Sequence, residues 1–276
     1  MAQCKVCFRH CEIKEGKAGY CGARGLVSGE VVPLNYGRIT SLALDPVEKK
    51  PLARFCPGSM ILSVGSYGCN LNCPFCQNHD ISKPDNSLRI DKITPEDLAD
   101  LAMRLRDRDN IGIAFTYNEP LIGYEFVRDT ARLVHDKGMK NVMVTNGTSE
   151  LDILEELLPF IDAMNVDLKC FSERTYKETL GGSFEQVKAF IGRASSDCHI
   201  ELTTLIVPGM NDTEEEMRQL STWIASLPSG RDIPLHISRF FPRYKMEDAK
   251  PTPVDKVYRL AEVARSKLSF VYTGNC

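Results

Sequence analysis

The sequence predicts an α/β protein: a partial parallel (β/α)6 barrel with a small N-terminal cysteine-rich metal-binding appendage. The first observation is that short apolar segments alternate with amphipathic segments from residue 61 onward, which is the pattern of βα units around a parallel sheet. The second is that residues 1–25 hold four of the eleven cysteines, in a composition that does not recur. A length of 276 residues suits one large domain with an appendage.

We divide the chain at residue 60. Residues 1–60 are expected to form the cysteine-rich metal-binding segment and a short β-rich bridge, and residues 61–276 the barrel. Because a closed barrel of this kind has eight strands, fewer units predict a barrel that is open at its side. The six expected strands lie near residues 61–67, 111–117, 141–145, 162–168, 200–206 and 234–239.

Three helix starts are visible in the sequence. Thr94 and Thr252 are each followed by proline, so each is expected to be an N-cap with proline at the first helical position. Asp212 is expected to cap the helix that follows it. The apolar residues that follow each start recur at spacings of three and four, so we expect them to face the core.

Composition limits the classes of function. A net charge of −3 and an isoelectric point near 6.0 give no broad cationic field, which disfavours extensive nucleic-acid binding. Neither a secretory leader nor an apolar run of membrane-spanning length is visible, so we expect a cytoplasmic protein without a membrane partner. In a reducing compartment, grouped cysteines favour metal binding over disulfides.

The first cysteine group to carry chemistry follows the strand expected at residues 61–67. Cys69, Cys73 and Cys76 have the spacing C-x3-C-x2-C. Thiolates are the usual ligands of iron–sulfur clusters, and three of them leave one iron free to bind a small molecule. The alternative is a structural zinc site completed by a distant ligand such as Cys56 or His79.

This loop resembles the motif of the radical S-adenosylmethionine (SAM) superfamily, including the aromatic Phe75 before the last cysteine. The resemblance implies that Cys69, Cys73 and Cys76 hold a [4Fe-4S] cluster that reductively cleaves SAM. It also implies that Phe75 lies close to the adenine of SAM.

The end of the second strand resembles another superfamily feature. In a parallel barrel, residues that do chemistry collect where strands end. The stretch 116–120 resembles the Gly-Gly-Glu-Pro stretch that holds the amino group of SAM, with Tyr117 and Asn118 in place of the glycines. The resemblance implies that Asn118 and Glu119 bind the cofactor.

The later strand ends resemble the glycyl-radical-enzyme activases, of which pyruvate formate-lyase activating enzyme is one. Thr145 and Asn146 match one SAM-binding stretch, Asp167 and Lys169 a second, and His236 a histidine that contacts SAM. Period-two spacing puts Asp167 and Lys169 on one face of a strand. Taken singly, these features favour a surface pair, a turn and a core histidine, but their order along successive strands favours a cofactor site.

The second cysteine group opens the chain. Cys4, Cys7, Cys11 and Cys21 follow C-x2-C-x3-C-x9-C, which suits a closed zinc site or an auxiliary iron–sulfur cluster, and both remain open. Together with the stretch 45–52, this block resembles the radical SAM member of the three-component AmmeMemoRadiSam system.

The resemblance implies an oxidoreductase in which a low-potential donor such as flavodoxin or ferredoxin supplies the electron for SAM cleavage. The resulting 5′-deoxyadenosyl radical would abstract hydrogen from a protein, as in activases. Two alternatives remain: radical SAM modification of RNA or a small molecule, and a non-catalytic scaffold protein stabilised by zinc.

Overall fold

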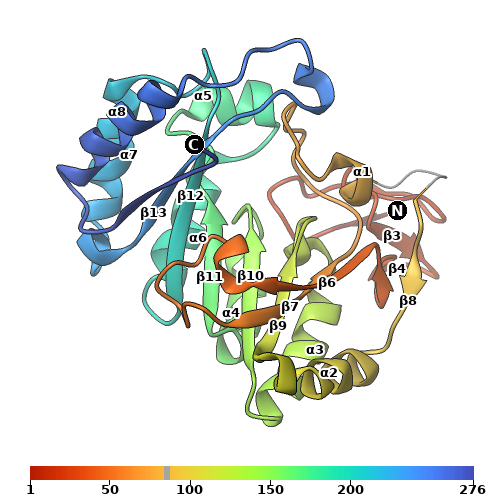
Figure 1. Cartoon of the computed structure of the whole chain (residues 1–276). Coiled ribbons are helices and arrows are strands. Elements are labelled where there is room, and N and C mark those ends of the chain that lie inside the picture. Colours follow the sequence, from red (N-terminus) through yellow and green to blue (C-terminus); the bar gives the residue numbers. More distant parts are fainter. Residues whose placement is uncertain (84–87) are drawn as a thin grey trace.

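The computed structural model describes residues 1–83 and 88–276, and its centre is one eight-stranded sheet (Figure 1). Strand β6 pairs with β7 in the antiparallel sense. Every other pair of neighbouring strands in this sheet, from β7 to β14, is parallel. The predicted α/β class with a mainly parallel sheet is confirmed. In spatial order the strands are β14 (Val271–Gly274), β13 (Leu235–Arg239), β12 (His199–Ile206), β11 (Ala163–Asp167), β10 (Lys140–Thr145), β9 (Asn110–Thr116), β7 (Met60–Gly65) and β6 (Ser41–Pro46).

All six expected strands are present, as β7 and β9 to β13. The structure adds β14, a four-residue strand that is too short to show a periodic pattern in the sequence and pairs with β13. It also adds β6, which lies in the expected bridge but pairs with β7 along its whole length. The division of the chain at residue 60 stays a prediction.

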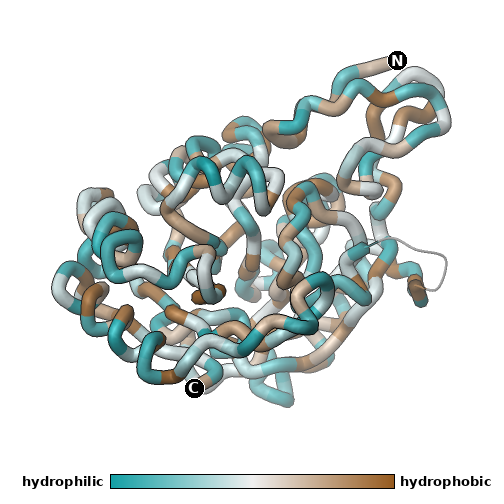
Figure 2. Tube along the Cα trace, turned by 90° about the horizontal axis from the view of Figure 1, so that it is seen from above, coloured by the Kyte–Doolittle hydropathy of each residue, from teal (hydrophilic) through white to brown (hydrophobic). Residues whose placement is uncertain are grey.

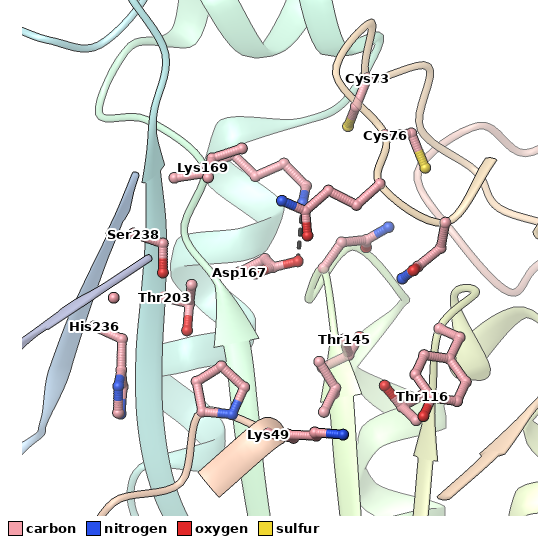
Figure 3. Close-up of a pocket in the computed structure, with 18 of the residues that line it drawn as sticks. Lys49, Cys73, Cys76, Thr116, Thr145, Asp167, Lys169, Thr203, His236 and Ser238 are labelled. Atoms are coloured by element: carbon pink, nitrogen blue, oxygen red, sulfur yellow. Dashed lines mark hydrogen bonds and ion pairs between the residues drawn. The ribbon is translucent and has the colours of Figure 1, made fainter. Parts of the chain in front are cut away.

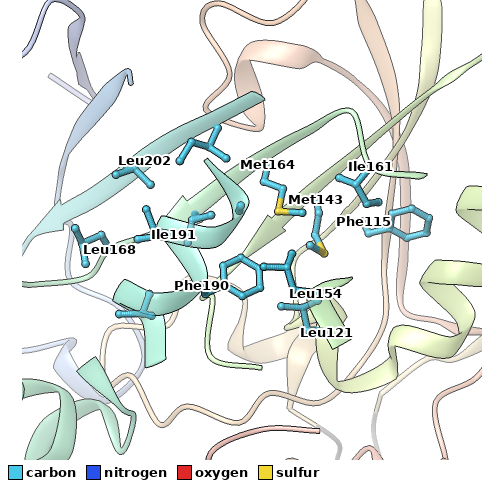
Figure 4. Close-up of a cluster of buried hydrophobic side chains, with 14 of the residues drawn as sticks. Phe115, Leu121, Met143, Leu154, Ile161, Met164, Leu168, Phe190, Ile191 and Leu202 are labelled. Atoms are coloured by element: carbon cyan, nitrogen blue, oxygen red, sulfur yellow. The ribbon is translucent and has the colours of Figure 1, made fainter. Parts of the chain in front are cut away.

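Helices cover the outer face of the sheet (Figure 1). Figure 4 shows the resulting core, in which Met143 and Met164 from the sheet lie near Leu154 and Phe190 from the helices. These side chains are fully buried. The stripes expected after the three predicted helix starts also face the core, since Leu98, Leu220 and Leu260 are buried. The six longest described helices are α2 (Pro95–Arg104), α3 (Tyr124–Asp136), α4 (Leu151–Leu157), α6 (Phe184–Ala194), α7 (Glu214–Ala225) and α8 (Val254–Arg265).

One of the three expected helix caps is confirmed and two are wrong. The Thr94 hydroxyl caps α2 by accepting a bond from the backbone three residues later. Thr252 instead donates to the carbonyl of Ile206, so α8 starts one residue further along. Thr213 rather than Asp212 caps α7, because the Asp212 carboxylate accepts bonds from the preceding loop and from α8.

The N-terminal segment lies on the opposite side of the molecule from α7 and α8 (Figures 1 and 2).

Among the described residues, no helix has the length and apolar content that crossing a membrane requires. The small elements are β1 (Ala2–Gln3), β2 (Glu12–Ile13), β3 (Arg24–Val27), β4 (Glu30–Pro33), β5 (Arg38–Ile39), β8 (Asp91–Lys92), α1 (His79–Ser82), α5 (Glu173–Thr175) and the π-helix η5 (Tyr176–Leu180).

Residues 47–54, which we call the floor segment, cross the inner face of the sheet. Val47 and Leu52 are fully buried there against side chains of β7, β9, β10 and β11. Among those partners, Ala114, Val142 and Ala163 are paired with one another across three adjacent strands. The floor segment therefore fills the inner side of the sheet with apolar side chains.

A buried carboxylate ties the floor segment to the far strands. Glu201 on β12 accepts bonds from the backbone amides of Ala53 at 2.9 Å and Arg54 at 2.8 Å. Its oxygens also lie 3.0 Å from Nε2 of His199 and 2.6 Å from Nε2 of His236. Burial alone would raise the pKa of Glu201, but these hydrogen bonds lower it to about 2.

We predict that Leu52→Ala lowers the free energy of unfolding by about 2–5 kcal/mol, because it leaves a cavity between the floor segment and the sheet. Leu42→Ala is the matched control, since Leu42 is 40% exposed and its truncation should change stability by less than about 0.5 kcal/mol. Chemical denaturation of both variants measures the difference. Equal losses would show that the floor segment is not part of the core.

We predict that Glu201→Gln makes the free energy of unfolding depend less on pH in the acid range. The folded-state pKa of Glu201 is about 2 against an ordinary 4.5, so its carboxylate stabilises the fold above about pH 4.5 and that contribution is lost as the pH falls toward 2. Between about pH 5 and about pH 3, the unfolding free energy of the wild type should fall by about 2 kcal/mol more than that of the variant. The exposed Glu30→Gln should behave as the wild type.

Candidate functional site

A cavity of about 720 Å³ lies where the parallel strands end, on the inner side of the sheet (Figure 3). Its position agrees with the rule that sites form at the carboxyl ends of parallel strands. It brings together every residue that the sequence assigned to the cluster or to SAM. These residues are Cys69, Cys73, Phe75, Cys76, Asn118, Glu119, Thr145, Asn146, Asp167, Lys169 and His236.

Strand register builds one wall of the cavity. Asp167 pairs with Thr203, Thr203 with His236, and His236 with Tyr272, so four adjacent strands each give one residue to a single row. All four line the cavity. Glu201 lies two residues before Thr203 on the same face of β12, directly below this row.

Asp167 and Lys169 form an ion pair at the cavity wall, with Nζ and Oδ2 2.9 Å apart (Figure 3). Burial alone would lower the pKa of Lys169, but the Asp167 carboxylate raises it well above its usual value. The ammonium is therefore charged. Figure 3 shows Lys169 extending toward the side of the cavity that carries Cys73. The pair thus presents both signs of charge to a ligand beside the cysteine loop.

Asn118 holds the start of the cysteine loop. Its side-chain amide donates to the carbonyls of Tyr67 and Gly68, both at 3.3 Å, and its oxygen accepts from the amide of Ser66 at 3.1 Å. Further along, the amide of Asn72 donates to a carbonyl of η5 at 2.8 Å. Asn118 therefore positions the loop, and a direct contact of Asn118 with SAM stays a prediction.

Glu119 joins the ends of β9 and β10. One of its oxygens accepts from the Thr145 hydroxyl at 2.7 Å, and the other accepts from the amide of Asn146 at 2.8 Å. Burial raises the pKa of Glu119 to about 7, although these hydrogen bonds act in the opposite direction. The carboxylate braces two strand ends that line the cavity, and its role at the amino group of SAM stays a prediction.

Asn146 connects this brace to the first cysteine of the loop. Its side-chain amide donates to Oδ1 of Asn70 at 2.9 Å and lies 3.9 Å from the sulfur of Cys69. Its own oxygen accepts from the amide of Thr148 at 3.0 Å. Because Asn70 and Asn146 are both almost fully buried, the backbone next to Cys69 has little freedom to move.

Tyr117 occupies a position where the Gly-Gly-Glu-Pro stretch has glycine. The backbone conformation at this position explains why glycine is suited to it. Tyr117 has a φ of +75°, in the left-handed region that favours glycine. Its hydroxyl donates to Asp45 at 2.8 Å and accepts from the buried Lys50 at 3.2 Å. These bonds hold a tyrosine in a conformation that is otherwise strained.

Glu201 and Lys50 support the site but are not among the site residues predicted from the sequence. Each left a signal, since Glu201 is a carboxylate within an apolar strand and Lys50 is a lysine directly before a proline. Their partners lie far away in the sequence, since Lys50 meets Tyr117, 67 residues later, and Glu201 meets Ala53, 148 residues earlier.

The three loop thiols are a suitable donor set for an iron–sulfur cluster. They are free and half-buried, and they line one cavity from a single loop. Burial raises the pKa of Cys69 to about 12, so a cluster would have to supply the positive charge that favours thiolate. As the described side chains stand, no three or more His, Cys, Asp or Glu converge to hold a single metal ion.

The second cysteine group lies apart from this cavity. Cys4, Cys7, Cys11 and Cys21 line a separate small cavity that Asn70 also lines. The structure therefore brings the four cysteines together and puts them against the cysteine loop. A metal bound by them stays a prediction.

Known proteins share both the sequence and the fold. The chain is 38% identical over 276 residues to the protein MJ0808 of Methanocaldococcus jannaschii, covering 99% of this chain and 81% of that protein. It is 24% identical over 206 residues to the pyruvate formate-lyase 1-activating enzyme of Escherichia coli K12, covering 72% of this chain and 80% of the relative.

Among solved structures, Streptococcus suis SuiB bound to S-adenosylmethionine has the same fold, with a TM-score of 0.59 and 13% identity over 75% of this chain and 48% of that one. The sequence pattern of the Radical SAM superfamily matches residues 63–222, which is more than half of the chain and includes the cysteine loop and strands β9 to β12. The chain belongs to the radical SAM superfamily.

Proposed function

We propose that Cys69, Cys73 and Cys76 hold a [4Fe-4S] cluster and that the cavity binds SAM beside it, as the first step of hydrogen abstraction from a protein substrate. The observation that carries the proposal is that the three thiols, the Asp167–Lys169 pair and His236 line one cavity of about 720 Å³. When bound, the cluster would supply the low-potential electron that cleaves SAM to the 5′-deoxyadenosyl radical.

The residues of this chain would orient SAM rather than transfer protons. Lys169 is charged and carries a donor, so it suits the carboxylate of SAM, whereas the Asp167 carboxylate suits its ribose hydroxyls. His236 stacks on Tyr272 with ring centroids 5.2 Å apart and is held by Glu201, so its ring has a fixed direction in the cavity wall. Phe75 is almost fully buried and offers an apolar face to adenine.

A protein substrate is favoured over other classes by the relatives. Several are named as activating enzymes, including the Escherichia coli relative and a putative glycyl-radical enzyme activating enzyme of Methanocaldococcus jannaschii. We infer that a low-potential electron donor, such as a flavodoxin or a ferredoxin, reduces the cluster. Deuterium-labelled protein, RNA and small molecules would be supplied in separate reactions. The class whose deuterium appears in 5′-deoxyadenosine would be the substrate class.

We predict that oxygen-protected, reconstituted protein binds about four more irons than the triple variant Cys69→Ala, Cys73→Ala, Cys76→Ala. With dithionite and SAM, the wild type should release 5′-deoxyadenosine and the triple variant should not. Cys56→Ala is the matched control, because Cys56 is an exposed cysteine that does not line the cavity and its removal should leave both readouts unchanged. Zinc instead of iron at the loop would contradict the proposal.

We predict that Lys169→Gln raises KM for SAM about 10–100-fold, because one charge-assisted hydrogen bond contributes about 1.5–3 kcal/mol. Initial rates of 5′-deoxyadenosine release at several SAM concentrations measure this. The exposed Lys177→Gln removes the same charge from the following helical segment and should leave KM unchanged. An unchanged KM in Lys169→Gln, with the iron content intact, would remove Lys169 from the SAM site.

A further inference from the structure

The four N-terminal cysteines all line one small cavity. All four are free thiols, of which Cys4, Cys7 and Cys21 are buried and Cys11 is half-buried. The cavity that they line with their neighbours has a volume of about 10 Å³, which corresponds to about one water-sized sphere. As the side chains stand, the space admits no more than a single ion.

The backbone around these cysteines is already folded into tight turns. The amide of Cys4 donates to the carbonyl of Cys11 at 2.9 Å. The amide of His10 donates to the carbonyl of Cys7 at 3.1 Å. The amide of Gly22 closes a similar turn around Cys21, with a φ of +73° that favours glycine. Apolar contacts with the rest of the protein hold these turns, since Cys4 belongs to the main core and Cys21 packs with Tyr67 and Ile122.

We propose that Cys4, Cys7, Cys11 and Cys21 bind one zinc ion in a closed four-thiolate site. Four sulfurs without an open position are the usual ligand set of structural zinc. Because the described side chains do not yet converge on a single ion, binding would turn the sulfurs inward around the small cavity. The ion would supply the positive charge that four neighbouring thiolates need.

The zinc site would fix the loop that carries Cys69. Arg9, between the second and third of these cysteines, donates to the carbonyl of Asn70 at 2.7 Å and to that of Gly181 at 2.5 Å. Its guanidinium also lies over the ring of Tyr20, 3.4 Å from the centroid. Asn70 directly follows Cys69 and also lines the cavity of the four cysteines. A rigid zinc site therefore clamps the loop through Arg9.

Metal analysis of the triple variant without Cys69, Cys73 and Cys76 tests the zinc site alone, so its result is independent of the proposed function. We expect about one zinc per chain, lost when Cys4→Ser and Cys21→Ser are added. If the added changes prevent folding, growth of the triple variant with cobalt gives a second test, since a four-thiolate site would show the absorption of tetrahedral Co²⁺. Absence of bound metal, or iron in place of zinc, would overturn the proposal.

Hydrogen exchange tests the clamp. In zinc-loaded protein, Arg9→Gln should keep the zinc but make the amides of residues 70–72 exchange at least about tenfold faster, because it removes charge-assisted hydrogen bonds to the loop. Lys5→Gln is the matched control, since it removes one exposed positive charge from the same segment. Equal exchange in the two variants would show that the N-terminal segment does not hold the loop.

Discussion

Backbone pairing between parallel strands sets the arrangement of this site. The register of β11, β12, β13 and β14 aligns Asp167, Thr203, His236 and Tyr272 in one row, with Glu201 below it. Because side chains alternate between faces, a slip of one residue would turn the whole row out of the cavity and into the apolar layer under the helices. The fully buried Glu201 opposes such a slip, since its oxygens are bound at once to the floor segment and to His236.

Several polar residues that line the cavity at the strand ends use their side chains to bind other parts of the chain. Asn118 binds the backbone of the cysteine loop, Glu119 joins two strands, and Asn146 connects that brace to Asn70. The other polar groups in the cavity wall are the three thiols, the Asp167–Lys169 pair and the His236 ring, and these are suited to meet a ligand. This division fits a protein whose task is to position a reactive cofactor and keep its surroundings rigid.

Membership of the radical SAM superfamily agrees with this geometry. What distinguishes this chain from a bare barrel is its beginning. The segment with four cysteines lies against the loop through Arg9 and Asn70, and the floor segment closes the inner face of the sheet. Both additions precede β7 in sequence and both contact the parts of the barrel that carry the site.

The six main strands and the spacing of Cys69, Cys73 and Cys76 could be predicted from the sequence, because periodicity and ligand spacing are local features. The SAM-binding residues at the strand ends were predicted from a resemblance to known families. That β14 extends the sheet, that Tyr117 adopts a left-handed backbone held by Asp45, and that Glu201 supports His236 became apparent only in the folded structure. Each of these depends on a partner from another strand or segment, and pairing between distant segments leaves no periodic signal in a single sequence.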